Sequence, residues 1–210
     1  MSTNSPLTIG ILVSGRGSNM LSILKHIERG ELRVRVGLVI SNNPQSPALD
    51  HATKHGVPTA VINHRDYRGD KAGFESAMND ALRKHGVDLI ALAGFMRLLS
   101  PDFVGQWKNS IVNIHPSLLP AFPGLNAQEQ ALTGGAKISG CTVHFVDEGT
   151  DTGPIIAQRA VPVKDNDSID TLSARILSEE HKLYPKVLGW LAEGRISVQD
   201  GRVYVESNDG

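Results

Sequence analysis

Short, largely apolar runs alternate with amphipathic segments along the first half of this 210-residue chain, and no other feature restricts its fold as strongly. A run such as Leu7–Val13 is typical of a strand that is covered on both faces. Amphipathic segments follow these runs, and Gly56 and Gly86 stand where two helices are expected to end. Strands separated by helices form parallel sheets with helices on each face. We therefore predict an α/β protein with a three-layer αβα architecture, in which the middle layer is a mostly parallel, twisted sheet.

In the first half we predict strands at 7–13, 33–40, 57–62, 87–93 and 110–114, and helices at 19–27, 48–55 and 74–85. The second half of the chain shows a different pattern of elements. Two later strands, at 141–146 and 155–161, are joined by a connection without helical periodicity, which favours antiparallel pairing. A long amphipathic helix is expected over 170–191, kinked or divided at Pro185. Asp200-Gly201 then predicts a terminal hairpin.

Charge and cysteine content exclude several classes of protein. With 21 basic and 22 acidic residues, the chain has no net charge that would attract nucleic acid or a membrane surface. The single cysteine, Cys141, excludes an internal disulfide and predicts a small buried side chain. Residues 1–6 lack the hydrophobic region of a signal peptide, and 207–210 are expected to fray. These properties predict a cytoplasmic enzyme that acts on small molecules, and whether it is a monomer or a homodimer stays open.

The segment from Asn113 to Pro120 is the most informative for chemistry. Asn113 and His115 are separated by one residue on a predicted strand, so their side chains share one face. They also lie at the carboxyl end of the strand, where open α/β sheets bind ligands. One incoming carbonyl could therefore meet both side chains. Taken alone, His115 could equally be a turn or core histidine, and Asp151 an ordinary loop carboxylate.

A glycine-rich turn, Gly15-Arg16-Gly17-Ser18-Asn19, follows the first strand and opens the first helix. Glycines at such a turn let backbone N–H groups approach an anion, and the helix N-terminus favours negative charge. The third glycine of a dinucleotide fingerprint is missing, which argues against NAD or FAD. A single phosphate fits the turn better, although a tight strand-to-helix turn without a ligand is the alternative.

The motifs taken in order resemble the folate-dependent formyltransferases. The motifs that follow one another as in this family are Asn113–Pro120, Phe122-Pro123-Gly124, Val143–Val146 and Gly149–Gly153. The resemblance runs from about Thr8 to Arg195 and implies a Rossmann-like formyltransferase fold in a single domain, 1–210. It implies a mononucleotide-binding half over about 7–109 and a catalytic and folate-binding half over about 110–205. The implied reaction moves a formyl group from 10-formyltetrahydrofolate to glycinamide ribonucleotide in purine (IMP) biosynthesis.

The resemblance also assigns roles to single residues. The implied catalytic residues are Asn113, His115 and Asp151. The implied residues for the ribonucleotide are Gly17, Ser18 and Asn19 at the phosphate and Glu180 at the ribose. The implied folate residues are Lys71, Met96, Arg97, Leu98, Leu99, Val146 and Asp147. Lys71 stands where many relatives carry an arginine, so the charge is kept but the bidentate fork is lost.

Formyl transfer between nitrogens needs a stabilised oxyanion and a proton carried from one nitrogen to the other. Asn113 would donate an amide N–H, and His115 a second donor as imidazolium. Asp151 would favour that charge and orient a water that relays protons. His144 is interpreted as a packed structural histidine, with support of the catalytic residues as the alternative. The histidines show no His-Glu-x-x-His pattern, so we expect no metal.

Four other functions are weighed against this one. A methionyl-tRNA formyltransferase would carry an added RNA-binding domain, and a formyltetrahydrofolate deformylase would carry a regulatory domain before the glycine turn. A sugar-nucleotide N-formyltransferase keeps the same Asn, His and Asp and stays open. A nucleotide sensor without turnover is disfavoured, because Asn113, His115 and Asp151 are all present.

Overall fold

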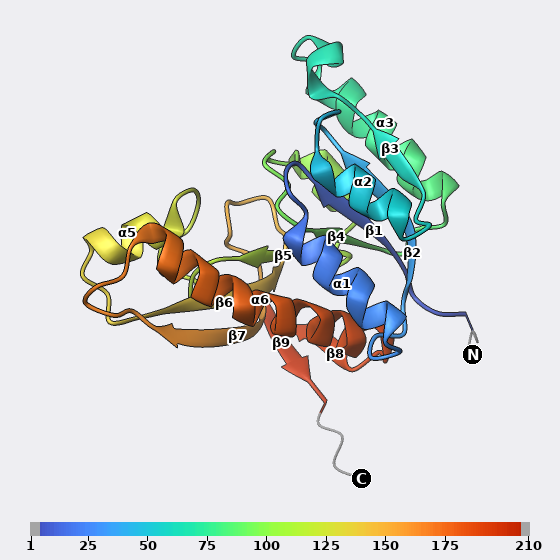
Figure 1. The fold of residues 1–210 in the computed structure, drawn as a ribbon. Coiled ribbons are helices and arrows are strands. Elements are labelled where there is room, and N and C mark those ends of the chain that lie inside the picture. The colour runs from blue at the N-terminus through green and yellow to red at the C-terminus, as the bar shows by residue number, and fades with distance from the viewer. Residues whose placement is uncertain (1–4, 207–210) are drawn as a thin grey trace. The chain divides into compact units, whose positions relative to one another are not determined.

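The structure, a computed structural model, describes residues 5–206 (Figure 1). Its internal contacts divide the chain into two compact units at the Val112–Asn113 bond, and each unit is described by itself. The frayed end expected over 207–210 lies outside the described residues, as do residues 1–4. Within residues 5–206, no helix is both long enough and apolar enough to cross a membrane.

Parallel strands form the centre of the first unit. They are β1 (Thr8–Val13), β2 (Arg35–Ser41), β3 (Thr59–Val61) and β4 (Leu89–Leu92). Strand β1 pairs in parallel with β2 on one side and with β4 on the other, and β2 pairs with β3. The predicted parallel sheet is confirmed. Because the chain crosses from β3 back past β1 to β4, the carboxyl ends of β1 and β4 form a topological switch point, where such folds bind ligands.

The helices of this unit are α1 (Ser18–Glu28), α2 (Pro47–Lys54), α3 (Lys71–Lys84) and α4 (Pro101–Gln106), with a 3₁₀ turn η1 (His64–Tyr67). Helix α3 packs so closely on β1 that a Cβ at Gly10 would lie 2.5 Å from Leu82 Cδ2. All residues of β1 are buried, as the apolar run predicts. Helix α4 and the turn η1 were not predicted, because segments this short show no helical periodicity.

The second unit begins inside β5 (Ile111–His115). Its other elements are α5 (Ala127–Thr133), β6 (Ile138–Phe145), β7 (Ile155–Pro162), α6 (Ile169–Ala192), β8 (Ile196–Gln199) and β9 (Arg202–Val205). Strands β6 and β7 pair antiparallel, and β8 and β9 form the predicted hairpin. Within the first unit, the strand order is β3-β2-β1-β4.

Helix α6 packs against β6 and β7 (Figure 1). Ser168 caps its start, since its side chain accepts a hydrogen bond from Thr171 N at 3.2 Å. Pro185 lies inside the helix and is buried, and the helix continues to Ala192. The predicted helix is confirmed, but a division at Pro185 is wrong: the helix continues as one element through the proline. Helix α5, like α4, was missed for its shortness.

Candidate functional site

Strand β5 carries two of the predicted catalytic side chains. Its first residues are apolar and buried, which fixes the strand in the sheet, and Pro116 follows its last residue. Asn113 Nδ2 lies 3.3 Å from His144 Nε2, and His115 Nδ1 lies 3.3 Å from Asp151 Oδ2. His144 Nε2 is also 3.6 Å from Asp151 Oδ1. The four side chains Asn113, His115, His144 and Asp151 form one group, the β5 cluster, and the expected closeness of Asp151 to His115 is confirmed.

Both ring nitrogens of His115 face atoms that only accept hydrogen bonds. Nε2 lies 2.9 Å from Phe122 O, and Nδ1 faces the carboxylate of Asp151. Nε2 must carry a proton in order to donate to Phe122 O, and a proton on Nδ1 as well would make the ring an imidazolium ion that pairs with the Asp151 carboxylate. The side chains of His115 and Asp151 are only 6% and 13% exposed, which strengthens their attraction. The Nε2–H of His115 is at the same time engaged by a backbone carbonyl.

Asp151 is held on an ordered loop between β6 and β7. Its backbone is left-handed, with φ 56°. Gly124 N donates to Asp151 Oδ2 at 2.8 Å, so the carboxylate also fixes the chain beyond β5. Asp147 Oδ1 accepts hydrogen bonds from Gly149 N at 3.1 Å and Thr152 Oγ1 at 2.7 Å, which closes the loop on itself. The carboxylate of Asp151 is therefore positioned from both sides.

His144 is both packed and connected to the other members of the cluster. Its Nδ1 lies 2.8 Å from Phe145 O, and a carbonyl only accepts, so Nδ1 carries the proton. Burial lowers the pKa of His144 below its ordinary value, so the ring is neutral at neutral pH. Its Nε2 then accepts a hydrogen bond from Asn113 Nδ2. This bond determines which end of the Asn113 amide faces His144.

The turn after β1 has the form expected of an anion site. Gly17 is the N-cap of α1, with φ 71°, and a Cβ there would lie 2.5 Å from Ala48 Cβ. Ser18 is the first residue of α1, and Asn19 is buried in its first turn, which holds no acidic residue. The free N–H groups of a helix start attract negative charge. Glycine is thus required here for backbone conformation and helix packing, whatever the turn binds.

Ser14, which the sequence analysis did not single out, joins the turn after β1 to the loop after β4. Ser14 N donates to Gly94 O at 3.0 Å, and Ser14 Oγ accepts from Met96 N at 2.8 Å. Ser14 Oγ also donates to Asn42 Oδ1 at 2.6 Å. The glycine-rich turn after β1 and the predicted folate loop are therefore tied together at the switch point.

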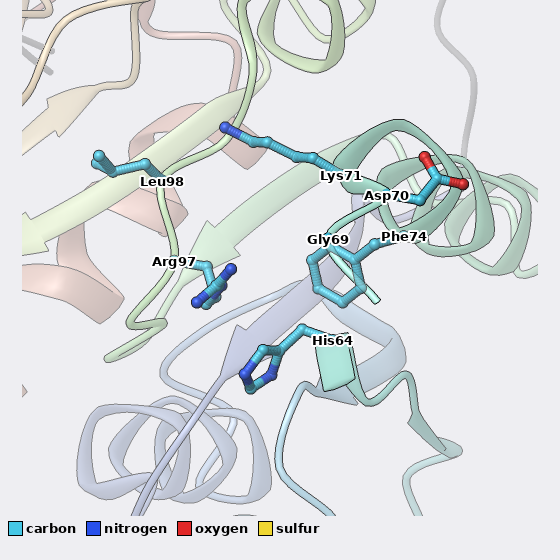
Figure 2. A pocket seen from close by; sticks show the side chains of 7 residues that line it. All are labelled: His64, Gly69, Asp70, Lys71, Phe74, Arg97 and Leu98. Atoms are coloured by element: carbon cyan, nitrogen blue, oxygen red, sulfur yellow. The ribbon is translucent and has the colours of Figure 1, made fainter. Parts of the chain in front are cut away.

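A pocket lies beside the loop that follows β4. Its lining residues are His64, Gly69, Asp70, Lys71, Phe74, Arg97 and Leu98. Figure 2 shows Lys71 and Phe74 from the start of α3, Arg97 and Leu98 from the loop, and His64 from η1 around this pocket. Three predicted folate residues, Lys71, Arg97 and Leu98, are thus brought together. Met96 and Leu99 lie on the same loop but are not among the lining residues.

The remaining predicted residues lie in the second unit. Val146 directly follows β6, and Asp147 closes the loop that carries Asp151. Glu180 lies on α6 and is 6% exposed, so it does not belong to an ordinary solvated helix face. Burial, with the charge of Glu180 adding to it, raises the pKa of Cys141 to about 12. Cys141 is buried as predicted. Among residues 5–206, no group of three His, Cys, Asp or Glu side chains could hold a metal ion.

Comparisons with known proteins agree with this arrangement. Residues 7–188 match the protein family described as formyl transferase. The chain is 42% identical to the phosphoribosylglycinamide formyltransferase of Bacillus subtilis, over 85% of this chain and 91% of that protein. The crystal structure of glycinamide ribonucleotide transformylase 1 from Symbiobacterium toebii is similar, with TM-score 0.94 and 43% identity over 98% of this chain and 96% of that chain. The chain is 44% identical to the trifunctional purine biosynthetic protein adenosine-3 of Bos taurus over 93% of its own length, but spans only 19% of that protein.

Proposed function

Because the chain belongs to the formyl transferase family, we propose that it transfers the formyl group of 10-formyltetrahydrofolate to the amine of glycinamide ribonucleotide, in purine biosynthesis. The names of its relatives support this acceptor. The single observation that carries the chemistry is the β5 cluster, in which an amide, an imidazole and a carboxylate converge at the end of a strand. A cytoplasmic location and a monomeric or dimeric state stay predictions.

The reaction joins one nitrogen to the formyl carbon and releases another. The neutral amine attacks the formyl carbon, the carbonyl oxygen becomes an oxyanion, and the bond to the folate nitrogen breaks. One proton leaves the incoming nitrogen and one is delivered to the departing nitrogen. Asn113 has a second amide N–H besides the one that it donates to His144, and this one would donate to the oxyanion.

His115 would supply positive charge and a second donor. The charge requires no rearrangement, because Asp151 Oδ2 already lies 3.3 Å from Nδ1. Donation from Nε2 requires the oxyanion to share or replace Phe122 O, which now lies 2.9 Å away. Asp151 would also orient the water that carries the proton between the two nitrogens.

The phosphate of the acceptor would bind at Gly17, Ser18 and Asn19, supported by the positive end of α1. Glu180 would bind the ribose hydroxyls. On the donor side, Lys71 and Arg97 supply positive charge to one pocket, which suits the carboxylates of the glutamate tail. Met96, Leu98, Leu99, Val146 and Asp147 would form the slot for the pterin ring.

A panel of acceptors tests the proposal. The protein is incubated with 10-formyltetrahydrofolate and, separately, glycinamide ribonucleotide, an amino-sugar nucleotide, methionyl-tRNA or no amine, and loss of the formyl donor is followed. Turnover is expected only with glycinamide ribonucleotide. Equal turnover without an amine would indicate a hydrolase and overturn the proposal. An Asn113→Ala variant run in parallel controls for contaminating activity.

A further inference from the structure

The loop between Gly94 and Ser100 contains no helix or strand, and its side chains give it little packing. Met96 and Leu98 are 66% and 70% exposed. Such a segment keeps one conformation only where its backbone is tied to neighbouring elements. At its start the tie is Ser14, which contacts Gly94 and Met96.

At its end the tie is Glu75, a carboxylate on α3 that is only 5% exposed. Ser100 N donates to Glu75 Oε1 at 2.7 Å, and Ser100 Oγ makes a short hydrogen bond to Glu75 Oε2. Ser100 Oγ also accepts from Phe103 N at 3.2 Å and caps α4. One carboxylate therefore fixes both the end of the loop and the start of the next helix.

The same carboxylate reaches the opposite side of the pocket. Glu75 Oε1 lies 3.9 Å from Lys71 Nζ, one helical turn earlier. Lys71 and Phe74 line the pocket from α3, and Arg97 and Leu98 line it from the loop (Figure 2). Glu75 is not among the lining residues, but it contacts Lys71 on one wall and the residue that ends the other wall.

We propose that Glu75 is a positioning residue for this pocket, because it fixes Lys71 on α3 and the Arg97–Ser100 part of the loop relative to each other. The proposal rests on the proposed function, in which the pocket receives the carboxylates of the folate tail. Two cations recognise two carboxylates only at a matched separation. Without Glu75, the loop end and Lys71 would move independently.

The test compares a donor with a tail and a donor without one. The probes are 10-formyl-5,8-dideazafolate and its analogue that ends at the benzoate. Glu75→Ala should raise KM about tenfold for the tailed donor, as expected for loss of a charge-assisted anchor. KM for the tail-less donor, and kcat with both, should change less than about threefold. A merely structural role would raise KM for both donors alike and would overturn the proposal.

Three further variants sharpen the result. Glu75→Gln can still accept from Ser100 N and donate to Ser100 Oγ, so it should restore most of the tailed-donor KM. Ser14→Ala loosens the other end of the loop and should affect both donors equally. Should Glu75→Ala fail to fold, Ser100→Ala must show a smaller effect, about threefold, confined to the tailed donor. An equal effect of Ser100→Ala on both donors would contradict the role of Glu75.

The same data separate this proposal from the proposed function. Equal binding of both donors by the wild-type protein would contradict the assignment of the folate tail to this pocket. A wild-type preference for the tailed donor that Glu75→Ala leaves unchanged would contradict only the role of Glu75.

Discussion

Asp151→Asn removes one negative charge from the β5 cluster while leaving its shape nearly unchanged. Asparagine adopts the left-handed conformation at φ 56° at least as readily as aspartate does. The amide oxygen can still accept from Gly124 N, and the new amide nitrogen would replace Oδ1, which lies 3.6 Å from His144 Nε2. The shape is kept, but the loss of the charge that faces His115 should lower the unfolding free energy by about 1–3 kcal/mol, so the variant should still fold.

The effect on the reaction follows from the distance between the charges. Two unit charges 3.3 Å apart attract by about 5 kcal/mol at an effective dielectric constant of 20 and about 1.3 kcal/mol in water. Since both side chains are nearly buried, the loss should lie toward the larger value. We expect the chemical step to slow by about 10²- to 10³-fold.

Single-turnover kinetics measures the chemical step, and calorimetry measures the dissociation constants of both ligands. Because the change acts mainly in the transition state, the dissociation constants should change far less than the rate. Asp165→Asn is the charge control, since Asp165 lies in the same unit, is exposed and forms its ion pair with Lys137 at 2.8 Å. A folded Asp151→Asn protein that reacts within a few-fold of wild type would remove Asp151 from the mechanism.

The other predictions concern His144, Gly17 and metals. His144→Asn loses the acceptor for Asn113 and should lower kcat about 3- to 10-fold, whereas His144→Gln can keep it and should stay nearer to wild type. Since burial lowers the folded-state pKa of His144, wild type should lose stability as the pH falls below about 6.5, and His144→Gln should lack that part of the loss in denaturant titrations. Gly17→Ala should destabilise the fold by about 1–3 kcal/mol and weaken ribonucleotide binding. Gly30→Ala is the control and should destabilise the fold less, because Gly30 shares the positive φ but its added Cβ would meet no atom within 4 Å. Equal thermal shifts of the two variants would contradict this. Exhaustive chelation should leave the initial rate unchanged, and a loss that zinc or magnesium restores would overturn the oxyanion assignment.

The sequence was sufficient to predict the sheet and the centre of the β5 cluster. Continuous apolar strands identified the parallel sheet, and the spacing of Asn113 and His115 placed both at a strand end. That Asp151 lies close to His115 was predicted only from the resemblance of the motifs. Periodicity relates residues within one helix or strand and cannot relate two residues this far apart in sequence.

Backbone partners and buried acids could not be predicted in this way. Phe122 O and Gly124 N reach the cluster through a loop whose left-handed residues include Phe122 itself. Amino-acid type alone does not predict that a non-glycine residue such as Phe122 adopts a positive φ. Glu75 looks in sequence like any surface acid of an amphipathic helix, and only the loop that covers it makes it a buried anchor. Ser100-Pro101, a serine cap followed by proline, was a usable sign of α4.

Formyl transfer to the amine is tested most directly by following the formyl carbon itself. The wild-type protein is mixed with glycinamide ribonucleotide and 10-formyltetrahydrofolate carrying ¹³C in the formyl group, and the products are followed by carbon NMR. The label is expected as the formamide of the ribonucleotide, at the rate at which tetrahydrofolate appears. Label found as free formate, with the ribonucleotide amine unchanged, would contradict transfer and show hydrolysis instead.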